Sequence, residues 1–86
     1  MKTLAPYHQT LSAALEAAND YLAATGAVLN DSAISEEFAY GGVPYGTSKE
    51  AHARLIAYKG KPTGKYAHVT VWRSEGGIYE VNAYVL

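Results

Sequence analysis

Apolar residues recur at every third or fourth position over residues 10–25, TLSAALEAANDYLAAT, which is the spacing of an α-helix. One stripe along this helix consists of Leu11, Leu15, Ala18, Leu22 and Thr25. Thr10 or Ser12 is placed to cap the start of the helix, and Gly26 to end it. The pattern therefore predicts one helix that lies on a sheet with its leucines turned inward.

The last part of the chain alternates between apolar and polar residues instead. The segments YAHVTVWR (66–73) and IYEVNAYVL (78–86) are rich in β-branched and aromatic residues and predict the two strands of a hairpin. A loop of Ser74, Glu75 and Gly76, with Gly76 at positive φ, places the apolar residues of both strands on one face and the aromatic and polar residues on the other. A loop of two or four residues would mix the faces.

This hairpin has two faces of different character. The apolar face, which we assign to the core beneath the helix, consists of Ala67, Val69, Val71, Tyr79, Val81, Ala83 and Val85. The other face is aromatic and polar, with the predicted cross-strand pairs Trp72–Ile78, Thr70–Glu80, His68–Asn82 and Tyr66–Tyr84, and with Leu86. A face of this composition is typical of a binding surface. In the alternative, residues 31–48 fold over it.

The middle of the chain gives weaker signals. AVLN (27–30) predicts a short strand, and HARLIAY (52–58) predicts a strand or, with the residues before it, a short helix capped by Ser48. Residues 31–48 stay open between extended chain and a first helical turn at 31–34. Together the segments predict a single α+β domain: an N-terminal helix packed on an antiparallel sheet of about four strands that ends in a β-hairpin.

Composition narrows the class of protein. The chain has 86 residues, of which 49% are hydrophobic and 17% charged, as in one globular domain over residues 1–86. It has no cysteine, which excludes disulfides and thiolate metal sites, and we expect neither a metal nor a cofactor. Without a long apolar run or a signal peptide, we expect a cytoplasmic protein with no membrane partner.

Charge divides between the two halves of the chain. Residues 1–46 hold one lysine against five carboxylates, a net −4, and residues 47–86 hold six cations against three carboxylates, a net +3. The total of −1 lacks the positive excess of a dedicated nucleic-acid binder. The end of the chain falls within the last predicted strand, whose exposed edge invites pairing with a second copy, so we also predict a homodimer.

Two glycine-rich segments resemble phosphate-binding loops in part. In GGVPYGTSK (41–49) Gly41 and Gly46 have the P-loop spacing, but the residue after Gly46 is Thr47 rather than lysine, and Pro44 removes a backbone N–H, so the segment fails as a P-loop. Both it and GKPTGKY (60–66) nevertheless supply donors for an anion. One hypothesis is therefore a sponge that sequesters a nucleotide signal between the two loops, using Tyr45, Thr47, Ser48, Lys49, Lys61, Thr63, Lys65, His68 and Trp72.

A third class of function is a small enzyme. His68, Glu80 and Asn82 share one predicted sheet face and form the only polar cluster suited to general acid–base chemistry. More often such residues form a hydrogen-bonded surface patch, and the sequence predicts no catalytic residue.

The C-terminal half resembles small accessory proteins encoded by tailed bacteriophages and prophages. The resemblance lies in YGGVPYG (40–46), GKPTGKYAHVTVWR (60–73) and GIYEVNAYVL (77–86). It implies a protein that binds and blocks host machinery, such as CRISPR complexes, nucleotide-signal defences or polymerases. Of these we favour non-catalytic inhibition of a host defence system, of the anti-CRISPR type, by binding a host protein or complex. Our leading hypothesis assigns this binding to residues that offer aromatic anchors or phosphate-like charge: Glu36, Glu37, Tyr40, Tyr45, Trp72 and Tyr84.

Overall fold

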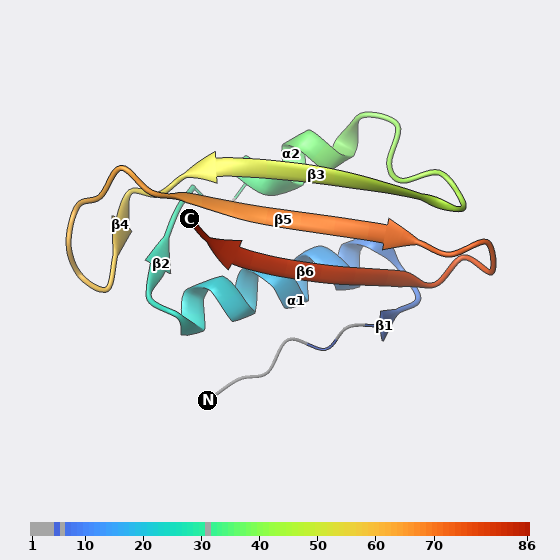
Figure 1. The fold of residues 1–86 in the computed structure, drawn as a ribbon, viewed down its shortest axis with the longest axis horizontal. Coiled ribbons are helices and arrows are strands. Elements are labelled where there is room, and N and C mark those ends of the chain that lie inside the picture. Colours follow the sequence, from blue (N-terminus) through green and yellow to red (C-terminus); the bar gives the residue numbers. More distant parts are fainter. Residues whose placement is uncertain (1–4, 6, 31) are drawn as a thin grey trace.

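In the computed structural model of the chain, two helices lie on one side of an antiparallel sheet (Figure 1). The structure describes residues 5, 7–30 and 32–86. The elements in chain order are β1 (Tyr7–His8), α1 (Leu11–Ala24), β2 (Ala27–Val28), α2 (Ala33–Ala39), β3 (Thr47–Arg54), β4 (Ala57–Tyr58), β5 (Tyr66–Arg73) and β6 (Tyr79–Val85). The main sheet has the order β1-β6-β5-β3, and β2 pairs with β4 in a second, two-stranded sheet. The predicted α+β class, with a helix on a four-stranded antiparallel sheet, is confirmed.

Helix α1 forms where its spacing predicted it. The Thr10 hydroxyl accepts a hydrogen bond from the Ala13 N–H at 3.1 Å and so caps the first turn. Gly26 follows the last turn at a φ of +93°, a conformation that a side chain would strain. Ala14, Leu15, Ala18 and Leu22 are buried against the sheet, as expected for the inward stripe.

Helix α2 lies within residues 31–48, the segment for which the sequence left extended chain and a helical turn as alternatives. Ile34 and Phe38, one turn apart, are each 1% exposed and pack into the same core as α1. The Lys49 ammonium donates to the carbonyls of Glu37 at 2.8 Å and Tyr40 at 2.9 Å, which otherwise lack partners at the helix end. Because α2 lies on the same side as α1, the alternative in which residues 31–48 cover the mixed face is wrong. The predicted helical turn at 31–34 includes Asp31, which lies outside the described residues.

The predicted strand 52–58 is divided between two sheets. Strand β3 begins earlier, at Thr47, and ends at Arg54, while β4 comprises only Ala57 and Tyr58. At the buried Leu55 the chain leaves the main sheet. The next residue pairs with the second sheet, where the Ile56 N–H donates to the Val28 carbonyl at 2.7 Å. The alternative of a short helix here is wrong. Of the strand predicted at 27–30, only Ala27 and Val28 pair, with β4.

The hairpin has the predicted faces but a different register. Five residues rather than three separate β5 from β6, and the Ser74 N–H donates to the Ile78 carbonyl at 2.9 Å. Gly77, not Gly76, takes the positive φ, at +90°. The observed pairs are Trp72–Glu80, Thr70–Asn82 and His68–Tyr84, so every predicted pair was shifted by two residues. A shift of two leaves each side chain on its own face.

The edges of the sheet also differ from the expectation. Strand β6 is not an edge at its start, because β1 pairs with its first two residues, Tyr79 and Glu80. Among the described strands, β3 has a neighbour on one side only, along its full length. The edge that led us to expect a homodimer is therefore partly covered, and the homodimer stays a prediction.

Candidate binding surface

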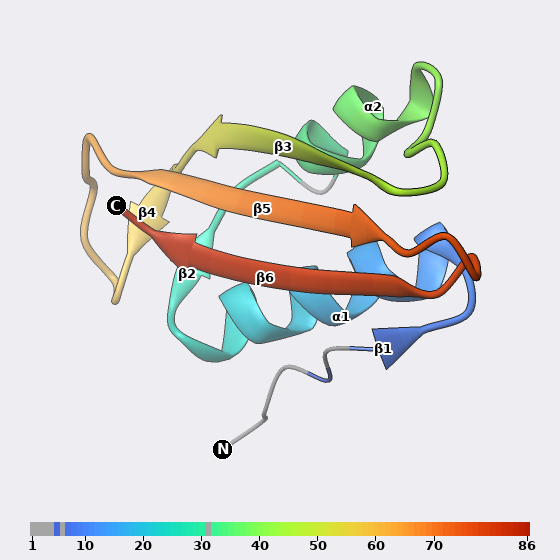
Figure 2. The same cartoon turned by 45° about the vertical axis from the view of Figure 1, so that its right-hand side comes forward.

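The even-numbered residues of β3, β5 and β6 point away from both helices and form one surface. This open face consists of Ser48, Glu50, His52, Arg54, Tyr66, His68, Thr70, Trp72, Glu80, Asn82 and Tyr84, extended by Tyr7 of β1. The odd-numbered neighbours of these residues include Val69 and Val71, which are fully buried. Figures 1 and 2 show both helices on the far side, so no described helix or strand covers the open face.

A stack of rings crosses the middle of the open face. His52, His68 and Tyr84 are aligned because the register places His68 opposite both of the others. The His68 and Tyr84 rings are parallel within 5° with centroids 4.9 Å apart, and the His52 ring lies 5.6 Å away on the other side. The Tyr66 ring meets His52 edge-on at 5.9 Å. With both ring faces covered, His68 is held in one orientation.

Glu50 fixes the position of His68 further. Its Oε1 lies 3.1 Å from His68 Nδ1, and the contact becomes an ion pair when the imidazole is protonated. The structure therefore gives His68 a carboxylate partner, but from β3 and not from β6. Glu80 and Asn82, predicted to cluster with His68, lie in the rows of Trp72 and Thr70 instead. The shifted register is the reason that this predicted acid–base cluster does not form.

Trp72 borders a shallow hollow on the open face. The hollow has a volume of about 280 Å³ and is lined by Thr70, Trp72, Glu80, Val81 and Asn82. The Trp72 side chain is 40% exposed, as is that of Tyr84. A half-exposed indole beside hydrogen-bonding groups combines a large contact area with specificity.

The residues of the predicted phosphate site are not brought together. Thr47, Ser48 and Lys49 start β3, whereas Lys61, Thr63 and Lys65 belong to the loop beyond its other end (Figure 1). Eight residues of extended strand separate the two loops by about 26 Å. Lys49 moreover points to the end of α2, and the Thr47 hydroxyl donates to the Pro44 carbonyl at 2.7 Å. A phosphate held between the two loops is therefore ruled out by the length of β3.

The predicted protein-binding anchors fall into three places. Trp72 and Tyr84 lie on the open face. Tyr45 lies in the loop before β3, where the Arg73 guanidinium stacks on its ring at 3.8 Å and on the Tyr79 ring at 4.8 Å. The remaining anchors belong to the helix layer, where they are exposed: Glu36, Glu37 and Tyr40. One flat partner cannot contact all three places at once.

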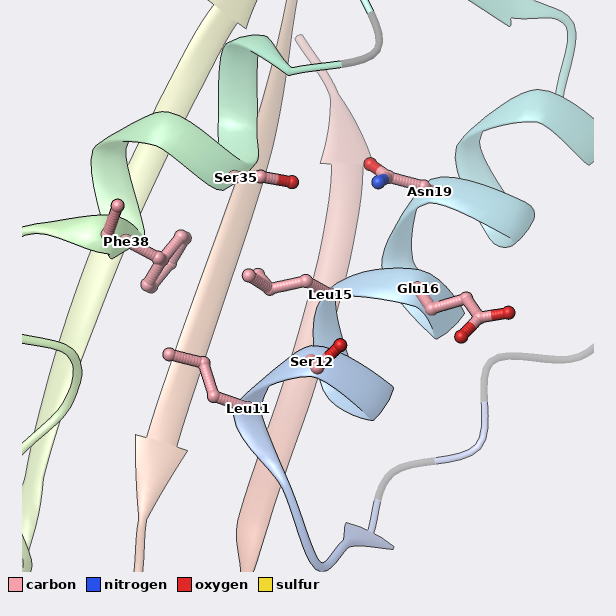
Figure 3. Close-up of a pocket in the computed structure, with 8 residues that line it drawn as sticks. Leu11, Ser12, Leu15, Glu16, Asn19, Ser35 and Phe38 are labelled. Carbon is pink, nitrogen blue, oxygen red and sulfur yellow. The ribbon is translucent and has the colours of Figure 1, made fainter.

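The helix layer has a hollow of its own, between α1 and α2. Figure 3 shows the side chains of Leu11, Leu15 and Phe38 converging at its floor, with Ser12 and Ser35 among the residues at its rim. Its volume is about 430 Å³, larger than that of the hollow at Trp72. Leu15 and Phe38 are only 8% and 1% exposed, so the floor is the outer surface of the core.

Sequence reasoning missed the contribution of β3 to the open face. The prediction that a strand begins at His52 left Glu50 outside the sheet and gave His52 no partner. A usable signal was present, because TSKEAHAR places polar residues at 48, 50, 52 and 54 and alanines at 51 and 53. The inward Lys49 interrupts that alternation, which is why the strand appeared to start later.

A comparison of the chain with models of protein families, with curated proteins and with solved structures found no match. Within the described residues, no three or more histidine and carboxylate side chains are grouped as metal ligands. None of the described helices has the length and apolarity needed to cross a bilayer. The geometry of the open face is therefore the main guide to function.

Proposed function

We propose that this chain is a non-catalytic binding protein whose open face docks on a protein partner. The observation that supports this is the one-sided cover of the sheet. Both helices lie on one face, and the opposite face presents Trp72, Tyr84 and the histidine stack with no described element over them. Tyrosine and tryptophan are the residues that most often dominate the free energy of protein association.

The open face is also preorganised for binding. Because His68 is enclosed by His52, Tyr84 and Glu50, few rotamers are left to lose when a partner arrives. Ordering a free side chain at an interface costs about 0.5–1.5 kcal/mol, and a stacked side chain has already lost that freedom. The polar groups around the aromatic centre match the usual arrangement of an interface core and its rim.

We further propose that the partner is a component of a host defence system, which the protein inhibits in the manner of anti-CRISPR proteins in the host cytoplasm. The resemblance of residues 40–46, 60–73 and 77–86 to phage accessory proteins supports this part of the proposal. Trp72 and Tyr84 are its anchors. Glu36, Glu37 and Tyr40, on the helix layer, are not part of the proposed interface, because they face away from the open face.

A plaque assay tests the proposal. The protein is expressed in bacterial strains that carry active CRISPR systems of different types, and plaque formation by a targeted phage is counted. We expect wild-type protein to restore plaques in a sensitive strain, and Trp72→Ala and Tyr84→Ala to lose this effect. Tyr40→Ala is the matched control, because Tyr40 is 85% exposed but belongs to the helix layer.

Two results would overturn the proposal. One is that no strain is protected by the wild-type protein. The other is that Tyr40→Ala loses the effect while Trp72→Ala and Tyr84→Ala keep it, which would move the interface to the helix layer. Circular dichroism of each purified variant excludes loss of folding as the cause.

A further inference from the structure

Glu80 lies between two aromatic residues in a single cross-strand row. In the register of the sheet, Trp72 of β5 is directly opposite Glu80 of β6, and Tyr7 of β1 is opposite Glu80 on the other side. Directly opposite residues share a face of the sheet and have Cβ atoms about 4.5–5.5 Å apart. Glu80 therefore has an aromatic residue beside it on each side, and Trp72 lines the same hollow.

This carboxylate has no partner of its own in the described chain. No described residue donates a hydrogen bond to the Glu80 carboxylate or forms an ion pair with it, although the residue is partly buried. The other carboxylate of the open face, Glu50, is already engaged by His68. Thr70 and Asn82, which line the same hollow, add a hydroxyl and an amide that can both accept hydrogen bonds.

These groups together favour a cation. Carboxylate, hydroxyl and amide oxygens attract positive charge, and the faces of indole and phenol rings do so through their quadrupoles. A guanidinium fits better than an ammonium, because it is planar, stacks on a ring and donates two parallel hydrogen bonds to one carboxylate. We propose that the Trp72 hollow receives an arginine side chain of the protein partner. This inference rests on the proposed function and names the chemistry of its binding partner.

The protein contains a probe for this site, since Trp72 is its one tryptophan. Intrinsic fluorescence is recorded while an arginine-rich peptide is added, and again with the same peptide in which citrulline, the neutral isostere, replaces each arginine. We expect a saturable change with the arginine peptide and none with the citrulline peptide. Equal binding of both peptides would overturn the inference.

Two matched variants locate the charge. Glu80→Gln removes the carboxylate charge in the hollow, and we expect it to weaken binding of the arginine peptide by about tenfold or more. Glu16→Gln makes the same change in net charge on the exposed side of α1, and we expect no effect. Equal weakening by both would show general attraction to an acidic protein and would overturn the inference. The NMR amide signals of Thr70 and Asn82, followed in the Trp72→Phe variant while the arginine peptide is added, give a second measure of binding at the hollow.

The plaque assay separates this inference from the proposed function. If Trp72→Ala and Tyr84→Ala lose inhibition while Glu80→Gln keeps it and binds the arginine peptide no worse, the arginine site is wrong and the docking face stands. If the peptide results are as expected but Trp72→Ala and Tyr84→Ala still inhibit, the hollow binds a guanidinium and the proposal that the open face is the inhibitory interface is wrong.

Discussion

The two faces of strand β5 differ in the size and the chemistry of their side chains. Its inward residues, Ala67, Val69 and Val71, are small and fully buried, whereas its outward residues include Trp72 and His68. Valine and alanine are among the residues most often fully buried, whereas Trp, Tyr and His are more often only partly buried. Alanine supplies six of the sixteen buried apolar residues that the structure describes, and on β5 the rings of Tyr66, His68 and Trp72 lie on the outer face. The inner face therefore serves stability, and the proposed docking assigns contact with a partner to the open face.

The strongest test of this comparison is to remove the largest fully buried side chain among the described residues, Phe38. Phe38→Ala is expected to lower the free energy of unfolding by about 3–5 kcal/mol, because it leaves a cavity between α2 and the sheet. That is most of the stability of a domain of this size, on the order of 5 kcal/mol. Urea unfolding followed by circular dichroism measures the loss. A cost below about 1 kcal/mol would mean that α2 is not part of the core.

A matched pair on β5 sharpens the comparison. Val71→Thr places a hydroxyl on the fully buried face and is expected to cost about 1–3 kcal/mol, since that hydroxyl has no partner there. Thr70→Val makes the reverse isosteric change one residue away, on the open face, and is expected to change stability by less than about 0.5 kcal/mol. Both are measured by urea unfolding. Equal costs would show that the two faces are not distinct.

The smallest expected effect concerns the open face alone. Glu50→Gln removes the charged partner of His68, and we expect stability to change by less than about 0.5 kcal/mol, because the Glu50 side chain is 50% exposed to solvent. The NMR signals of the His68 ring should nevertheless shift, since Nδ1 loses its charged partner. A large loss of stability on urea unfolding would mean that this contact holds the sheet together.

The sequence predicts the parts of the fold whose periodicity has one interpretation. Helix α1 repeats its apolar stripe over four turns, and the hairpin alternates over two long segments, so both faces were predicted correctly. Register was not, because a slip of two residues preserves alternation and only the turn distinguishes the alternatives. That turn depends on Gly77 adopting positive φ rather than Gly76.

The middle of the chain was ambiguous for a physical reason. Ile34 and Phe38 are four residues apart, and four is both about one helical turn and two repeats of a strand. Nothing else in AISEEFA distinguishes these, so α2 could not be predicted. Of the candidate site, Trp72 and Tyr84 were predicted on the open face, whereas the contact of His68 with Glu50 depends on a pairing between β3 and β5 that no local pattern specifies.

The stacking of Arg73 between Tyr45 and Tyr79 makes the two ends of the sheet unequal. It joins the loop before β3 to the hairpin, so amide protons at that end should exchange with deuterium together, in one cooperative opening. At the other end the loop around Thr63 is held by hydrogen bonds of its own, from the Lys61 N–H to the Tyr58 carbonyl and from the Lys65 N–H to the Thr63 hydroxyl, each at 3.2 Å. Its amides should therefore exchange in a separate opening. The two ends of the sheet should open in separate events.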